Sequence, residues 1–119
     1  MKLHHVQLAI PPNSESQCRE FYCVILGWEE RPKPLALAKR GGLWLTNGEV
    51  DLHLGVEQDF RPALKAHPAF LTTNLTAIAA ILAKHNHIVT WDDELEAFDR
   101  FYVSDAVGNR LEFMQTKPV

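Results

Sequence analysis

Apolar and polar residues alternate along several short stretches of the chain, as they do in β-strands that bury one face. The clearest stretch is 49–56, in which Val or Leu fills every second position. Together with shorter apolar runs, the pattern predicts eight strands, at 3–10, 28–34, 42–45, 49–56, 67–71, 87–91, 98–104 and 110–114.

Two other stretches repeat their apolar residues at helical spacing. The first opens at Ser14, which forms a capping-box sequence with Gln17, and ends at Gly27. The second is capped by Asn74 and ends near Asn86. Each predicted helix has one apolar stripe, which indicates packing against a sheet.

The predicted elements have the same order in both halves of the chain: a strand, a helix and three further strands. Polar residues repeat as well. His5 matches His67 at a separation of 62 residues, and His53 matches Glu112 at a separation of 59. We interpret this as an internal duplication of about half the chain.

The length of 119 residues is enough for one domain with a real core. We therefore expect a single domain over 1–119. Within it we expect module one at 1–56, a linker at 57–66 and module two at 67–119.

Composition and charge restrict the partners and surroundings of the protein. A formal net charge of −3 without a Lys/Arg stripe argues against a nucleic-acid surface. No apolar run has the length of a membrane span, and no leader pattern follows Met1. Cys18 and Cys23 fall on different faces of the first predicted helix, so we expect no disulfide between them. Free thiols are typical of a reducing compartment, and we expect a soluble, cytoplasmic protein.

Four residues that can bind metal stand on the polar side of the first and last strands of each half: His5, His53, His67 and Glu112. If each half curls into half a barrel, these side chains turn into a shared cavity. Imidazole and carboxylate groups suit Zn, Ni, Mn or Fe. A single such histidine is better interpreted as a polar residue on a solvated face, but four at equivalent places favour a metal site. No sequential motif such as H-E-x-x-H is present, so the prediction depends on symmetry.

Five sequence motifs are spread over nearly the whole length of the chain. They are His4-His5-Val6-Gln7-Leu8, Phe21-Tyr22-x-x-Ile25-Leu26-Gly27-Trp28, Val50-x-Leu52-His53-Leu54, His67-Pro68-Ala69-Phe70 and Phe101-Tyr102-Val103-x-Asp105-x-x-Gly108-Asn109-x-x-Glu112-Phe113. With these motifs the chain resembles the vicinal-oxygen-chelate superfamily. That superfamily includes glyoxalase I, bleomycin-resistance proteins, fosfomycin-resistance thiol transferases and extradiol dioxygenases. The last motif is specific for the superfamily fold, and none is specific for a substrate.

The resemblance implies an α+β fold of paired βαβββ modules, whose curved mixed sheets enclose a cavity and whose helices lie outside. It implies a divalent metal ion held by His5 and His53 of module one and by His67 and Glu112 of module two. Glu112 would also be the catalytic residue. The expected function is a metal-dependent, glyoxalase-like lyase or isomerase, or a dioxygenase, that acts on a small oxygen-bearing substrate.

The chain departs from the superfamily pattern at His53, where glyoxalase I-like enzymes generally place a glutamate. A fourth ligand there would fill a position that extradiol dioxygenases leave open for catechol and oxygen. The missing carboxylate also removes a candidate general base. The alternative function is therefore a metal-free protein that binds a small molecule, like the bleomycin-resistance proteins.

Other residues share the polar side of the predicted strands. Arg100 and Tyr102 alternate with Phe101 and Val103, so they are expected in the cavity, where an arginine suits a polar or anionic ligand. The candidate substrate contacts are Gln7, Trp44, Arg100, Tyr102 and Met114. The acidic stretch 92–97 is predicted to be a solvated loop.

A homodimer is expected because each curved sheet has edges that need a partner. The pattern also leaves Trp28 and Trp44 on the surface. Resemblance to glyoxalase I and bleomycin-resistance proteins favours pairing of a module with the complementary module of a second chain. The ten-residue linker 57–66 permits pairing within or between chains.

Overall fold

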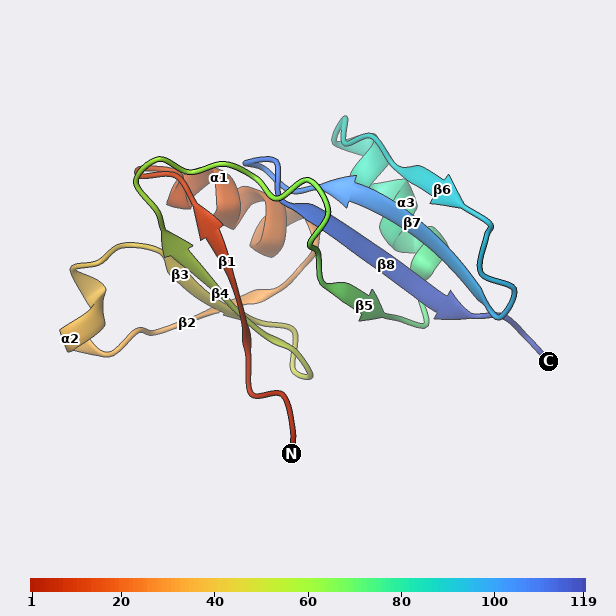
Figure 1. Cartoon of the computed structure of the whole chain (residues 1–119), viewed down its shortest axis with the longest axis horizontal. Helices are drawn as coiled ribbons and strands as arrows, with labels where there is room; N and C mark the ends of the chain where they lie inside the picture. The colour runs from red at the N-terminus through yellow and green to blue at the C-terminus, as the bar shows by residue number, and fades with distance from the viewer. The chain divides into compact units, whose positions relative to one another are not determined.

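The structure contains two four-stranded mixed β-sheets (Figure 1). The computed structural model describes residues 1–119, and the chain divides into two units, Met1–Pro62 and Ala63–Val119. The boundary between the units falls inside the predicted linker 57–66. None of the helices is both long enough and apolar enough to span a membrane.

Unit 1 contains four strands and three short helical segments. In chain order they are β1 (Val6–Ile10), α1 (Glu15–Arg19), η1 (Glu20–Ile25), β2 (Glu29–Arg31), α2 (Leu35–Ala38), β3 (Leu43–Thr46) and β4 (Asp51–Val56). The strand order in the sheet is β1-β4-β3-β2. β1 and β4 are parallel, whereas the other neighbours are antiparallel.

Strand alternation separates an apolar from a polar face in unit 1. Leu43 pairs with Leu54 and Leu45 pairs with Leu52, and all four side chains are buried. The alternate positions include Trp44 and His53, which pair with each other on the opposite face. Trp44 and His53 therefore lie on the face of the sheet opposite the four buried leucines.

The predicted helix 14–27 is present but changes type after its first turn. α1 continues into η1, a π-helix, and Phe21, Tyr22 and Ile25 of η1 are buried. Figure 1 shows this helical segment behind β1. Gly27 ends the helix with a φ of 78°, as predicted from its tolerance of the left-handed region.

Unit 2 repeats the same order of elements, without a counterpart of α2. They are β5 (Ala69–Leu71), α3 (Leu75–Lys84), β6 (Thr90–Asp92), β7 (Phe98–Ser104) and β8 (Arg110–Thr116). The strand order β5-β8-β7-β6 corresponds position by position to that of unit 1, and β5 is parallel to β8. The α+β fold and the duplicated βαβββ order predicted from the sequence are therefore confirmed.

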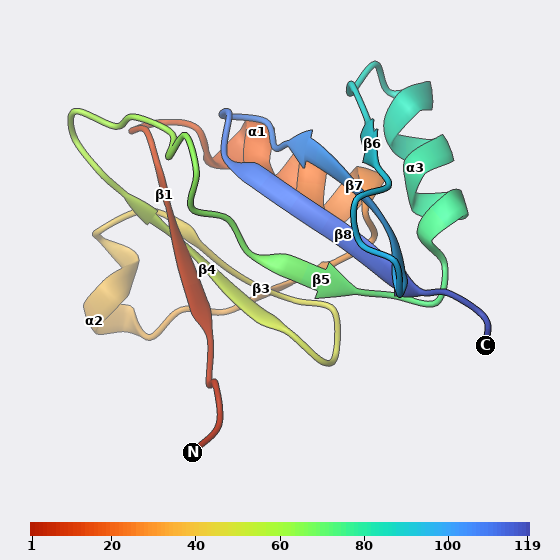
Figure 2. The same cartoon turned by 45° about the vertical axis from the view of Figure 1, so that its right-hand side comes forward.

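The core of unit 2 lies between its sheet and α3, which packs against β7 and β8. Figures 1 and 2 show α3 on one side of this sheet. Phe101 and Phe113 pair across β7 and β8 with ring centroids 5.4 Å apart, and both are buried. Glu112 and Tyr102 also pair across these strands, on the opposite face.

Several local predictions were wrong. The first strand begins at Val6 rather than at 3, the second ends at Arg31 rather than at 34, and the fifth begins at Ala69 rather than at 67. Ser14 does not form a capping box, because its hydroxyl donates instead to the carbonyl of Pro11 at 2.7 Å. The sixth strand begins at Thr90 rather than at 87. The His87 amide still donates to the carbonyl of Leu82 and completes the turn that ends α3. A one-turn helix, α2, forms in a stretch for which no helix was predicted.

The structure also bears on the predicted exposure of Trp28 and on the predicted state of the two cysteines. Trp28 is only 8% exposed and packs against Tyr22 with ring centroids 5.9 Å apart, so it gives no support to a surface interface. No disulfide joins Cys18 and Cys23.

Candidate functional site

Three aromatic side chains form a column across the polar face of unit 1. The His53 ring on β4 stacks on Trp44 of β3, with centroids 4.3 Å apart and planes inclined by 10°. His5, just before β1, stacks on His53 at 4.0 Å and 16°. Because β4 lies between β1 and β3, the three rings follow one another across the sheet.

The His53 imidazole is favoured in its neutral form. Burial lowers the pKa of His53 below its ordinary value of 6.5, and the nearby His5 ring lowers it further. A neutral imidazole has a lone pair that can bind a metal ion or accept a hydrogen bond. The planes of His5 and His53 are nearly parallel, so the two rings must rotate before both can direct lone pairs at one ion.

The aromatic column borders a cavity of about 650 Å³ in unit 1. Trp44 and His53 line it, together with charged side chains from β2 and β4, namely Glu29, Arg31 and Asp51. Gln7, a predicted substrate contact, is exposed on β1 opposite His53 and does not line the cavity. Of the predicted substrate contacts in this unit, only Trp44 faces the cavity.

In unit 2, the side chain of His67, just before β5, contacts the side chain of Glu112 on β8. The Glu112 amide bonds to the carbonyl of Pro68 at 3.1 Å, which ties the segment after His67 to β8. His67 Nε2 lies 2.9 Å from Glu112 Oε1. Glu112 is only 5% exposed, so its charge needs partners within the protein.

The tautomer of His67 follows from its other nitrogen. Nδ1 lies 2.8 Å from the carbonyl oxygen of Lys65, and a carbonyl only accepts, so Nδ1 carries a hydrogen. In the neutral ring, Nε2 then presents a lone pair to Glu112 Oε1, which is an acceptor when ionised. His67 Nε2 and Glu112 Oε1 can therefore share one cation, either a proton or a metal ion.

Arg100 holds the second oxygen of Glu112. Its Nη1 donates to Glu112 Oε2 at 3.3 Å. Its Nη2 and Nε donate to Asp92 Oδ1 at 2.9 and 3.1 Å. A hydrogen bond from the Glu94 amide and the Arg100 guanidinium lower the pKa of Asp92 below its ordinary value of 3.8. Asp92 thus remains a carboxylate and fixes Arg100 against Glu112.

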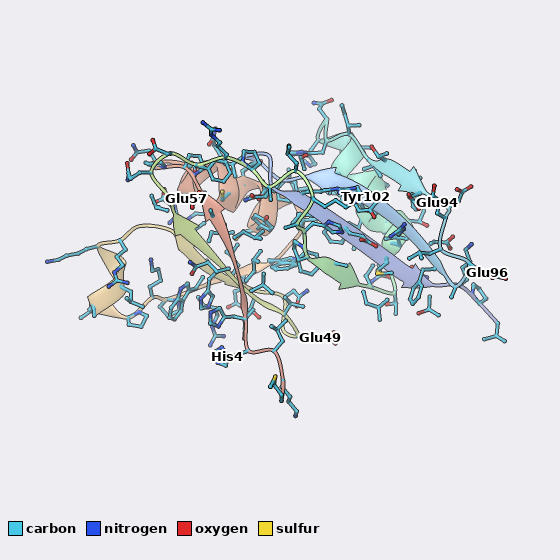
Figure 3. All side chains as sticks on the ribbon, viewed as in Figure 1. His4, Glu49, Glu57, Glu94, Glu96 and Tyr102 are labelled. Carbon is cyan, nitrogen blue, oxygen red and sulfur yellow. The ribbon has the colours of Figure 1, made fainter.

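Tyr102 and Met114 lie on the same face of this sheet. The Tyr102 ring, labelled in Figure 3, stands edge-on to the His67 ring with centroids 5.3 Å apart. Arg110 places its guanidinium carbon 4.2 Å from the centroid of Tyr102. Met114 is half-buried and pairs with Arg100 across β7 and β8.

The sequence interpretation missed two members of this cluster. Asp92 was assigned to a solvated loop, which is wrong, because it is the last residue of β6 and binds Arg100. The predicted strand ended at 91, one residue too early, and therefore excluded Asp92, which pairs with Arg100. Arg110 could have been found, since it has the same strand parity as Glu112.

Comparison with solved structures gives a close match over nearly the whole chain. A protein from Bacillus anthracis assigned to the glyoxalase family is 44% identical, with a TM-score of 0.94. The match covers 98% of this chain and 96% of that one. This chain belongs to the glyoxalase family. The vicinal-oxygen-chelate superfamily, expected from the sequence motifs, is thereby confirmed.

More distant structures share the family's fold. TnmS3, an antibiotic binding protein from Streptomyces sp. CB03234, is 20% identical over 98% of this chain and 99% of that one, with a TM-score of 0.71. Lactoylglutathione lyase from Agrobacterium tumefaciens is 15% identical over 92% and 91%, with a TM-score of 0.69. These likenesses establish the fold alone. No protein-family model matches the chain, and no curated protein matches it.

The residues present fit a metal ion by their chemistry, in two pairs. Within either unit, no three His, Cys, Asp or Glu side chains gather closely enough to hold an ion. Each unit instead supplies two candidate ligands, His5 with His53 and His67 with Glu112. The second pair already has the backbone and side-chain hydrogen bonds that usually orient metal ligands.

Proposed function

We propose that this glyoxalase-family protein is a metal-dependent enzyme that acts on a small oxygen-bearing substrate. The observation that carries the proposal is the contact between His67 Nε2 and Glu112 Oε1. The Lys65 carbonyl fixes one hydrogen of His67 on Nδ1, so His67 Nε2 and Glu112 Oε1, 2.9 Å apart, share one cation between them, a proton or a metal ion. A divalent cation satisfies both atoms at once.

The four candidate ligands would have different roles. His67 and Glu112 would hold the ion with one imidazole and one carboxylate, while His5 and His53 would add two imidazoles. When bound, the metal ion would hold two oxygens of the substrate and stabilise negative charge that develops on them. Four protein ligands favour a glyoxalase-like lyase or isomerase over a dioxygenase, which needs open positions for substrate and oxygen.

Metal analysis of the purified protein tests the proposal most directly. Protein prepared without chelator and then supplied with Zn, Ni, Mn or Fe should retain close to one equivalent of one of these metals per chain, because structural imidazole and carboxylate sites bind tightly. Elemental analysis after gel filtration measures it. Retention of less than about a tenth of an equivalent of every metal would contradict a metal-dependent function.

Asp92 should affect metal affinity although it does not contact Glu112. In Asp92→Asn, the charge of Arg100 is compensated by Glu112 alone, so Arg100 competes more strongly with the metal for that carboxylate. We expect metal affinity to fall about ten- to a hundredfold, the usual effect of losing a residue that orients a ligand. Calorimetric titration with the metal measures the change. Asp93→Asn, at the exposed neighbouring position, is the control and should bind like the wild type.

A second candidate is metal-free binding of a planar molecule, favoured by the column of His5, His53 and Trp44 beside the 650 Å³ cavity. Aromatic side chains are suited to stacking on flat ligands. A protein with this fold, TnmS3, is an antibiotic binding protein. Unchanged ligand affinity after removal of all metal would support this candidate over the enzyme.

We also propose that the protein works as a homodimer. The strands β1, β2, β5 and β6 are all edge strands of their sheets. Unpaired strand edges favour association with another module. Analytical ultracentrifugation at working concentration tests the assembly.

A further inference from the structure

Tyr102 lies between two arginine side chains in unit 2. The guanidinium carbon of Arg110 lies 4.2 Å from the centroid of the Tyr102 ring, and that of Arg100 lies 5.4 Å away. The same ring meets the His67 ring edge-on and pairs with Glu112 across the strands. Tyr102 therefore connects both arginines to the candidate metal ligands.

The two arginines differ in the charges that they face. Arg100 forms ion pairs with Asp92 and Glu112, so its charge is already compensated. Arg110 takes part in none of the ion pairs of the structure. The nearest carboxylate along the chain, Glu112, is bound by His67 and Arg100. The next nearest, Asp105, accepts hydrogen bonds from backbone amides of its own turn.

The Arg110 guanidinium is thus a positioned cation without an anionic partner. It is half-buried, and its stacking on Tyr102 holds it in place. A guanidinium binds carboxylate and phosphate groups through two parallel hydrogen bonds. Because its place is already set, little side-chain entropy is lost when such an anion binds.

We propose that Arg110 binds an anionic group of the substrate, a carboxylate or a phosphate. The centroid distances of 4.2 Å from Arg110 to Tyr102 and 5.3 Å from Tyr102 to His67 place the cation within about 10 Å of the His67 ring. The substrate class is then a small acid whose anionic group lies several bonds from the oxygens held at His67 and Glu112. The second part rests on the proposed metal-dependent function, whereas anion binding at Arg110 does not.

The test uses metal-free protein and two simple anions. Sodium phosphate and sodium propionate are titrated separately at constant ionic strength, while NMR follows the Arg110 side-chain NH and the Tyr102 ring. We expect both signals to shift saturably with at least one anion, and the stronger anion identifies phosphate or carboxylate as the preferred group. Arg110→Gln should weaken this binding at least tenfold. Arg110→Lys keeps the charge but loses the planar fork, so its anion affinity should lie between those of the wild type and Arg110→Gln.

Arg61→Gln is the matched control, since Arg61 is exposed and lies in unit 1. It should bind both anions like the wild type. If neither anion shifts Arg110 and Tyr102, or if Arg110→Gln binds as well as the wild type, the proposal is wrong. Should Arg110→Gln fail to fold, Arg110→Lys decides, because wild-type affinity in that variant would also contradict recognition by the planar fork.

Repeating the titration after addition of Zn separates this proposal from the proposed function. If the protein binds the anion at Arg110 but no metal, anion binding is supported and the proposed metal-dependent function is wrong. If it binds Zn but no anion, the metal-dependent function is supported and anion binding at Arg110 is wrong.

Discussion

Glu112→Gln should lower metal affinity by at least about a hundredfold while leaving the fold intact, a loss larger than that expected for residues that only orient a ligand. The carboxylate supplies the only negative charge among the four candidate ligands. The glutamine amide keeps both of its neighbours: its oxygen can accept from Arg100, and its NH₂ can donate to the lone pair on His67 Nε2. Metal titration by calorimetry and thermal unfolding measure the two effects separately.

Glu96→Gln provides the matched control for this substitution, because Glu96 is an exposed glutamate in the loop between β6 and β7 (Figure 3). It changes the net charge equally and should leave metal affinity unchanged. Wild-type metal affinity in Glu112→Gln would show that Glu112 is not a ligand. Loss of folding in Glu112→Gln would show instead that the buried ion pair with Arg100 is structural.

The sequence predicted the fold well because strand alternation depends on local pattern alone. The polarity of residues 49–56 was sufficient to place Leu52 and Leu54 in the core and His53 on the opposite face. The repeated order of elements then indicated two copies of one unit, and both sheets have the same strand order. Neither step required knowledge of long-range contacts.

The site was harder to predict because its contacts depend on the alignment of neighbouring strands. His67 and Glu112 were grouped by symmetry, and the structure places them 2.9 Å apart. The roles of Arg100 and Asp92 depend on which residue of β6 lies opposite Arg100. The predicted strand ended at 91 and so left Asp92, the residue that pairs with Arg100, in the loop. Trp28 was assigned to the surface because it follows the end of the first helix. Its contact with Tyr22 of that helix cannot be predicted from the spacing of apolar residues.

Mixed dimers should reveal which chains supply the ligands of each metal site. We expect a heterodimer of one His5→Ala chain and one Glu112→Gln chain to bind one equivalent of metal, if each site takes His5 and His53 from one chain and His67 and Glu112 from the other. One of its two sites then has all four ligands, and the other lacks two. Two affinity tags isolate the heterodimer, and elemental analysis gives its metal content.

Sites confined to single chains give a different result. Each chain of the heterodimer would then lack one ligand, so neither of its two sites would be complete. We would then expect the heterodimer to retain no metal. Both single-variant homodimers serve as controls, since they lack an intact site under either arrangement. His5 is exposed and the glutamine at 112 keeps its neighbours hydrogen-bonded, so misfolding is not expected to cause the loss. A protein that sediments as a monomer at working concentration would exclude shared sites and leave only the arrangement within one chain.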